Sequence, residues 1–292
     1  MDRLLAPFAY DFFVAGLMAA TMAGALCGLV GVYITLRGMS YIGHGLSHAI
    51  FGGFAVSTLV GVNFFLGAGL WGLTSALAIN GVARRHRIGA DAAIGVVTTA
   101  SFALGVALLS RFGSRGPSFD AALFGSILGV STDQIVALAL VSLLALAVVV
   151  LRYRQLLFAT FDPDVADVSG VNVARTDALL MLVLSLSILA TLNVIGVTLV
   201  AATLVVPAVV ARMLTDSFAR MLVVSSGVGA VCGFVGMNLS YHLDVPSGTM
   251  IVLTGAAVFS VVLLLAGPRR RMLARRVVRS AAPAAAERVP QA

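Results

Sequence analysis

The chain has 292 residues, of which 60% are hydrophobic and only 11% are charged. Soluble domains typically carry about a quarter charged residues, so this composition excludes a soluble enzyme and predicts an integral membrane protein. The net charge of +7 is concentrated in residues 269–292, where seven arginines accompany one glutamate. Such a tail is typical of a segment that contacts membrane lipid headgroups, and it does not indicate a nucleic-acid site.

Apolar segments of roughly the length of a membrane span follow one another along the chain. They occupy residues 12–36, 40–61, 64–82, 91–111, 133–152, 177–194, 196–213, 219–240 and 248–266. The pair 177–194 and 196–213 is hardly separated and forms either a tight hairpin or an interrupted helix. We therefore predict an all-α fold, a polytopic bundle of eight or nine transmembrane helices over residues 1–268, with a disordered tail over residues 269–292.

The distribution of arginine predicts the orientation of the bundle. With nine spans, four groups of arginines lie on the same side of the membrane, and by the positive-inside rule that side is the cytoplasm. The groups are residues 84–87, residues 152–175, residues 212–220 and the tail. The C-terminus is therefore expected in the cytoplasm.

The first candidate site lies in the segment Gly38–Gly53. His44 and His48 are four residues apart, so on a helix they share one face, together with Ser40 and Ser47. A second stripe contains the small residues Gly45, Ala49 and Gly53. Small residues at this spacing allow another helix to approach closely, which predicts that the helix packs inside the bundle. The two imidazoles could hold a metal ion, or they could be satisfied by hydrogen bonds to neighbouring helices.

The loop after the segment 133–152 is expected to contain a short helix. Asp162 followed by Pro163 is a typical helix start, and Gly170 is a suitable stop, so the helix should run from Asp162 to Ser169. From the residues alone it is either an amphipathic connector or a docking helix for a cytoplasmic partner.

Two further places could take part in transport. Pro207 lies within an apolar segment and should kink its helix, as a static bend or as a hinge. His242 and Asp244 lie at the predicted outer end of a span, where they either collect a cation or merely end the helix. No HExxH, CxxC or nucleophile–base constellation accompanies these residues, so an enzyme is not expected.

The order of these signatures resembles the permease subunits of the metal-ion branch of ABC transporters, which import zinc, manganese and iron. The stretches that carry the resemblance are LRGMSYIGHGLSHAIFGG (36–53), ADAAIGVVTTASFALGVALL (90–109), ALFGSILGVS (122–131), FDPDVADVSGV (161–171), VIGVTLVAATLVVPAVVARML (194–214) and YHLDVPSGTMIVLTGAAVF (241–259). They cover nearly the whole chain, with the tail unmatched.

The resemblance implies a permease that works as a homodimer in the bacterial plasma (inner) membrane. Two copies of a cytoplasmic ATP-binding subunit would bind ATP, and an extracytoplasmic solute-binding protein would deliver the metal. The chain itself would bind no cofactor, which agrees with its lack of a GxxxxGKS/T motif. The family's coupling helix, which contacts the ATPase, matches Asp162, Pro163, Asp164, Val165, Ala166, Asp167, Val168, Ser169 and Gly170.

In this family a GDxxSHA-type stretch places an aspartate and a histidine in the ion path. The histidine matches His48, whereas His44 stands at the aspartate position. Imidazole suits zinc better than manganese, so the sequence favours zinc, with manganese or iron as alternatives. A function of another class is an ATPase-independent transporter or channel. It predicts ionisable residues deep in several spans, but here the aspartates lie at span edges. A non-transporting membrane anchor or sensor would not need the histidines.

Overall fold

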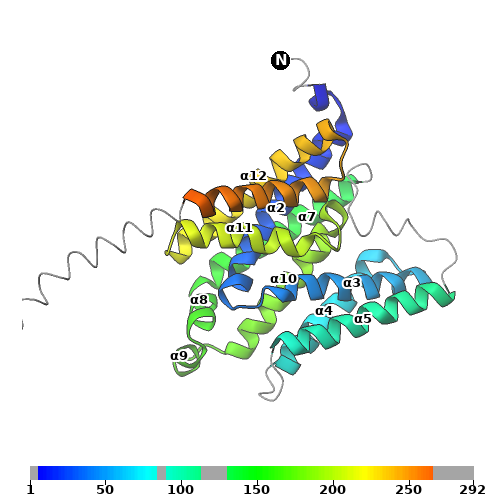
Figure 1. Cartoon of the computed structure of the whole chain (residues 1–292). Coiled ribbons are helices and arrows are strands. Elements are labelled where there is room, and N and C mark those ends of the chain that lie inside the picture. Colours follow the sequence, from blue (N-terminus) through cyan, green and yellow to red (C-terminus); the bar gives the residue numbers. More distant parts are fainter. Residues whose placement is uncertain (1–5, 84–89, 113–129, 266–292) are drawn as a thin grey trace, which may run out of the picture.

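The computed structural model of the chain describes residues 6–83, 90–112 and 130–265, and within these ranges every regular element is a helix (Figure 1). The elements are η1 (Ala6–Ala9), α2 (Asp11–Leu36), α3 (Tyr41–Val60), α4 (Phe64–Ala83), α5 (Ala90–Phe112), α7 (Thr132–Leu151), α8 (Tyr153–Phe161), α9 (Pro163–Val168), α10 (Val173–Ile195), α11 (Val200–Leu214) and α12 (Phe218–Leu243). A last helix spans Ser247–Leu265. Each predicted apolar segment falls on a separate helix, which confirms the all-α fold.

The predicted count of eight or nine spans is not confirmed. Six helices in the described part of the chain are long and apolar enough to cross a membrane, and two shorter apolar helices, Leu66–Val82 and Val200–Leu214, accompany them. The basic tail and the arginines at 84–87 lie outside the described residues, as does most of the matched stretch 122–131.

Two groups of helices make up the bundle. In the first group, α2 lies against α12, with α11 and the last helix beside them (Figure 1). The contact is close because glycines face each other: a Cβ on Gly24 would overlap the carbonyl of Gly229, and one on Gly28 would overlap that of Ser225. Close backbone contact through small residues is how helices associate where water supplies no hydrophobic driving force.

The second group contains α3, α4 and α5. Trp71 of α4 donates its indole N–H to Ser101 Oγ of α5 at 2.5 Å, and Ser101 donates to the carbonyl of Ala49 in α3 at 3.2 Å. One hydroxyl therefore joins all three helices inside an apolar environment. Helix α10 packs against both groups, since it contacts α4 as well as α2.

The short stretch between α10 and α11 is a tight turn of four residues. Helix α10 ends at Ile195, Gly196 has φ 91°, and α11 begins at Val200. A positive φ favours glycine, which explains why the two apolar segments are interrupted here. The start of the last helix covers the turn, where Ser247 Oγ donates to the carbonyl of Val194 at 3.3 Å.

Candidate functional site

The paired histidines lie one turn inside α3. Gly38 has φ 67° and redirects the chain after α2, so that α3 begins at Tyr41. The rings of His44 and His48 contact each other, with centroids 4.4 Å apart and an interplanar angle of 84°. His44 is exposed and His48 is half-buried. The predicted spacing therefore brings the two imidazoles together on one face.

The environment of His48 is apolar. Its ring packs edge-on against Phe102 of α5, with centroids 5.0 Å apart. Its Nδ1 atom is buried and has no hydrogen-bond partner among the described residues. The alternative in which neighbouring helices satisfy this nitrogen is therefore not supported, and a ring nitrogen stays free to accept a proton or to bind a metal.

The opposite face of α3 packs as the small residues predicted. A Cβ on Gly45 would meet Thr98 of α5 at 2.8 Å, and one on Gly53 would meet the Trp71 side chain of α4. Ser47 is wrong as a member of the histidine stripe: it is fully buried, and its hydroxyl donates to the carbonyl of His44 at 2.8 Å. His48 contacts α5 through Phe102, whereas His44 is exposed.

No complete metal site is found in the part of the chain that the structure describes. Within residues 6–83, 90–112 and 130–265, no three histidine, cysteine, aspartate or glutamate side chains come together as a possible metal-binding group. His242 and Asp244 are both exposed at the end of α12, and Asp244 ends this helix in the left-handed conformation, with φ 54°. Their helix-ending role is thus visible, whereas cation binding at the outer entrance stays a prediction.

The predicted short helix is present as α9. The Asp162 side chain accepts a hydrogen bond from the backbone N–H of Val165 at 3.0 Å, and Pro163 takes the first helical position. Gly170 has φ 80° and ends the helix. Ala166 is buried, while Val168 is 86% exposed. Helix α9 is therefore buried through Ala166 and exposes Val168, and its docking role stays a prediction.

The comparisons with known proteins agree with this arrangement. The family model described as the ABC 3 transport family matches residues 9–266. The chain belongs to this family. As an ABC 3 permease with several apolar helices, it is a multi-pass protein of the plasma membrane and a transport subunit of the metal-ion branch, which confirms the predicted family.

Relatives of the permease are similar over most of their length. It is 38% identical over 275 residues to the manganese transport system membrane protein MntC of Halalkalibacterium halodurans, covering 94% of this chain and 92% of the relative. It is 33% identical to the chelated iron transport system membrane protein YfeD of Yersinia pestis, covering 88% and 86%. The solved structure of PsaBC from Streptococcus pneumoniae in complex with Fab matches with a TM-score of 0.80 and 32% identity, covering 89% and 94%.

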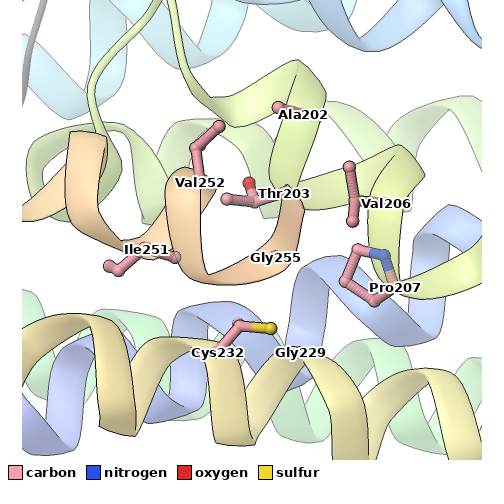
Figure 2. A pocket seen from close by; sticks show the side chains of 10 residues that line it. Ala202, Thr203, Val206, Pro207, Gly229, Cys232, Ile251, Val252 and Gly255 are labelled. Atoms are coloured by element: carbon pink, nitrogen blue, oxygen red, sulfur yellow. The ribbon is translucent and has the colours of Figure 1, made fainter. Parts of the chain in front are cut away.

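Pro207 of the permease lies beside a small apolar pocket. The proline is buried in α11, and the pocket of about 10 Å³ lies where α11 meets α2, α12 and the last helix (Figure 2). The residues that line it are Gly24, Ala202, Thr203, Val206, Pro207, Gly229, Cys232, Ile251, Val252 and Gly255. A volume of this size holds at most one water molecule, so it is a small packing defect beside Pro207 and no ligand site.

A polar cluster that was missed from the sequence lies near α9. Arg37, at the end of α2, pairs with Asp177 of α10, with Nη1 and Oδ1 2.7 Å apart. It also donates from Nε to Thr160 Oγ1 of α8 at 3.2 Å. The predicted segments 12–36 and 177–194 place Arg37 and Asp177 at the ends of two spans, but segment ends do not show which side chains pair.

Proposed function

We propose that this permease imports manganese, with iron as the second candidate, and that an ATP-hydrolysing partner subunit drives the transport. The relatives compared are named for manganese or for iron, and none is named for zinc. The zinc preference inferred from His44 thus has no support from them, and the manganese alternative fits them better.

The observation that carries the proposal is the contact between His44 and His48 on an open face of α3. An ion in transit must be bound briefly and released, so a transport site should be weak. Manganese lies at the weak end of the affinity order for divalent metals, and neutral imidazoles bind it less firmly than carboxylates do. Two imidazoles without a carboxylate therefore suit passage of this ion better than its storage.

The partial site supports a dimer. One chain supplies two imidazoles in contact, and His44 is exposed. A second copy of the permease against this face would supply two more and complete four nitrogen donors around one ion. We propose a homodimer for this reason, with the ion path at the contact between the two copies.

The partners follow from the two ends of the bundle. We propose that α9 docks onto a cytoplasmic ATP-binding subunit, one for each permease, through the exposed side chains of Val165 and Val168. A solute-binding protein on the other side would release the metal near His242 and Asp244. Closure of the ATPase would move α9, and Pro207 would take up part of the bending in α11.

The test is uptake of radioactive manganese, iron and zinc by proteoliposomes that carry the permease with its ATPase, with the binding protein added outside. We expect ATP-dependent uptake of manganese ahead of zinc, and its loss in the double variant His44→Ala and His48→Ala. Ser40→Ala is the matched control, because Ser40 is exposed just before α3 and caps nothing. Unchanged uptake in the double variant would remove the histidines from the path.

A transporter that needs no ATPase is the second candidate. It would take up metal in liposomes that carry the permease alone. That result would overturn the role proposed for α9, whereas uptake of zinc ahead of manganese would change only the metal.

A further inference from the structure

Arg37, which follows α2, connects this helix to α8 and α10 through its side chain. It is the C-terminal cap of α2, directly after Leu36, and it contacts Asp177 at 2.7 Å and Thr160 at 3.2 Å. The side chains of Arg37 and Asp177 are only 11% and 16% exposed. One guanidinium thus joins α2, α10 and α8 in a largely buried place.

On one side of Arg37 the connection leads to α9. Thr160 lies in the last turn of α8, and α9 begins at Pro163 after the single residue Asp162, whose N–H donates to the carbonyl of Phe158 at 2.9 Å. The rings of Tyr153 and Phe161, at the two ends of α8, pack against Phe218 of α12 with centroids 5.6 Å and 5.8 Å apart. Helices α8 and α9 are therefore connected without a flexible linker, and they should move together.

On the other side the connection leads to the histidines. Only Gly38, Met39 and Ser40 separate Arg37 from α3. This turn is closed by backbone hydrogen bonds, from Met39 N–H to the carbonyl of Ile34 at 3.0 Å and from Ile42 N–H to the carbonyl of Met39 at 2.9 Å. His44 follows within the first turn of α3, so a displacement of Arg37 is passed to the histidine face through a short and rigid segment.

The chemistry of the cluster is unlike that of a contact selected for stability. A largely buried ion pair loses hydration, and apolar side chains of the same size often stabilise a fold as well or better. In addition, Nη2 of Arg37 is buried and has no hydrogen-bond partner in the described part of the chain. The pair fixes a geometry between helices, which is the use best attested for buried ionic groups.

We propose that Arg37 is a positioning residue that transmits movement of α8 and α9 to the histidine pair on α3. The ion pair with Asp177 and the hydrogen bond to Thr160 make the end of α2 follow α8 and α10 when the ATPase pulls on α9. The inference rests on the proposed function only in that α9 is taken as the docking helix. It predicts that breaking the link uncouples ATP hydrolysis from transport.

The experiment uses the complete permease–ATPase complex in proteoliposomes and measures manganese transported per ATP hydrolysed. The main variant is the double substitution Arg37→Met with Asp177→Asn, because it leaves neither charge buried alone. We expect the complex to assemble and hydrolyse ATP, with the manganese transported per ATP about tenfold lower. The exchanged pair, Arg37→Asp with Asp177→Arg, should regain part of the loss.

Arg152→Met is the matched control. Arg152, like Arg37, is an arginine at the end of a helix, at the boundary of α7 and α8. In contrast to Arg37, it is exposed and bonds only to Gln155 among the described side chains, with Nη1 and Oε1 2.8 Å apart. The Arg152→Met variant should transport as much manganese per ATP hydrolysed as the wild type. A wild-type ratio in the main variant would overturn the proposal. So would loss of the assembled complex in both double variants, because the cluster would then be a structural contact only.

A second measurement does not depend on the metal. Spin labels at Tyr41→Cys and Arg154→Cys report the distance between α3 and α8; both positions are exposed, whereas the native Cys27 and Cys232 are buried. Trapping the complex with ATP and vanadate should change this distance in the wild-type background and leave it unchanged in the main variant. The same change in both backgrounds, or in neither, would overturn the proposal. An Arg37-dependent change without uptake of any metal would reject the proposed function alone.

Discussion

Gly24 of α2 and Gly229 of α12 lie backbone to backbone, and the relationship is reciprocal: a Cβ on either residue would overlap the carbonyl oxygen of the other. The contact continues one turn away in both directions, where Gly28 meets Ser225 and Gly233 meets Ala20. Small residues four apart on both helices therefore produce this close approach. Helices α2 and α12 therefore pack as a close pair over at least two turns.

This contact predicts a sharp difference between two glycines of the same helix. Gly229→Val should destabilise the permease by about 2 kcal/mol or more, since neither backbone can retreat without separating the helices. Gly227→Val is the control, because Gly227 is exposed and an added Cβ there meets nothing within 4 Å. The measurement is the temperature at which the detergent-purified protein loses its monodisperse peak in size-exclusion chromatography. Equal loss in both variants would contradict the packing argument.

Much of this architecture could be predicted from the sequence because its determinants are local. Apolar segments of the length of a span became helices, and Asp162, Pro163 and Gly170 set the ends of α9 at the predicted residues. The spacing of His44 and His48 was enough to predict that their rings share a face. Each of these features depends on residues that are close together in the sequence, within a single helix and its ends.

What could not be predicted depends on residues far apart in the chain. The predicted histidine stripe included Ser47, but neighbouring helices bury this side chain completely and its hydroxyl donates to the carbonyl of His44. Arg37 and Asp177 lie at the ends of the predicted segments 12–36 and 177–194, yet their pairing across 140 positions follows from the packing of α2 beside α10. Likewise, the sequence does not show which helix the glycines of α2 or of α12 pack against.

The identity of residue 44 should influence which metal is transported. In His44→Asp an imidazole nitrogen is replaced by a carboxylate oxygen, which suits manganese better than zinc. We expect the ratio of manganese to zinc uptake to rise by about tenfold, or about 1.4 kcal/mol of relative affinity. The measurement is competitive uptake in proteoliposomes that contain the ATPase. His44→Asn is the control for size, and the prediction fails if both variants shift the ratio equally.

The exposed valines of α9 should determine binding of the ATPase. Val168 is 86% exposed, so Val168→Asp leaves the permease folded but places a charge in the proposed apolar contact. We expect the Kd for the ATPase subunit to rise by about tenfold or more, measured by pull-down or by surface binding of the purified subunit. Val62→Asp, at an exposed position between α3 and α4, is the control. If the two variants bound the ATPase subunit equally well, α9 would be only a connector between α8 and α10.

Pro207 allows a test of hinge against static kink. In Pro207→Ala the new backbone N–H can bond to the carbonyl of Thr203, and the loss of the ring enlarges the pocket shown in Figure 2. If α11 bends during transport, the straighter helix should slow uptake on the order of tenfold while the thermal stability of the protein stays the same or rises. Pro246→Ala is the control, because Pro246 is exposed in the turn before the last helix and its substitution changes no helix interior. Uptake at the wild-type rate in Pro207→Ala would contradict the hinge. If α11 has to bend at Pro207 during transport, restoring its backbone hydrogen bond must change the rate of uptake.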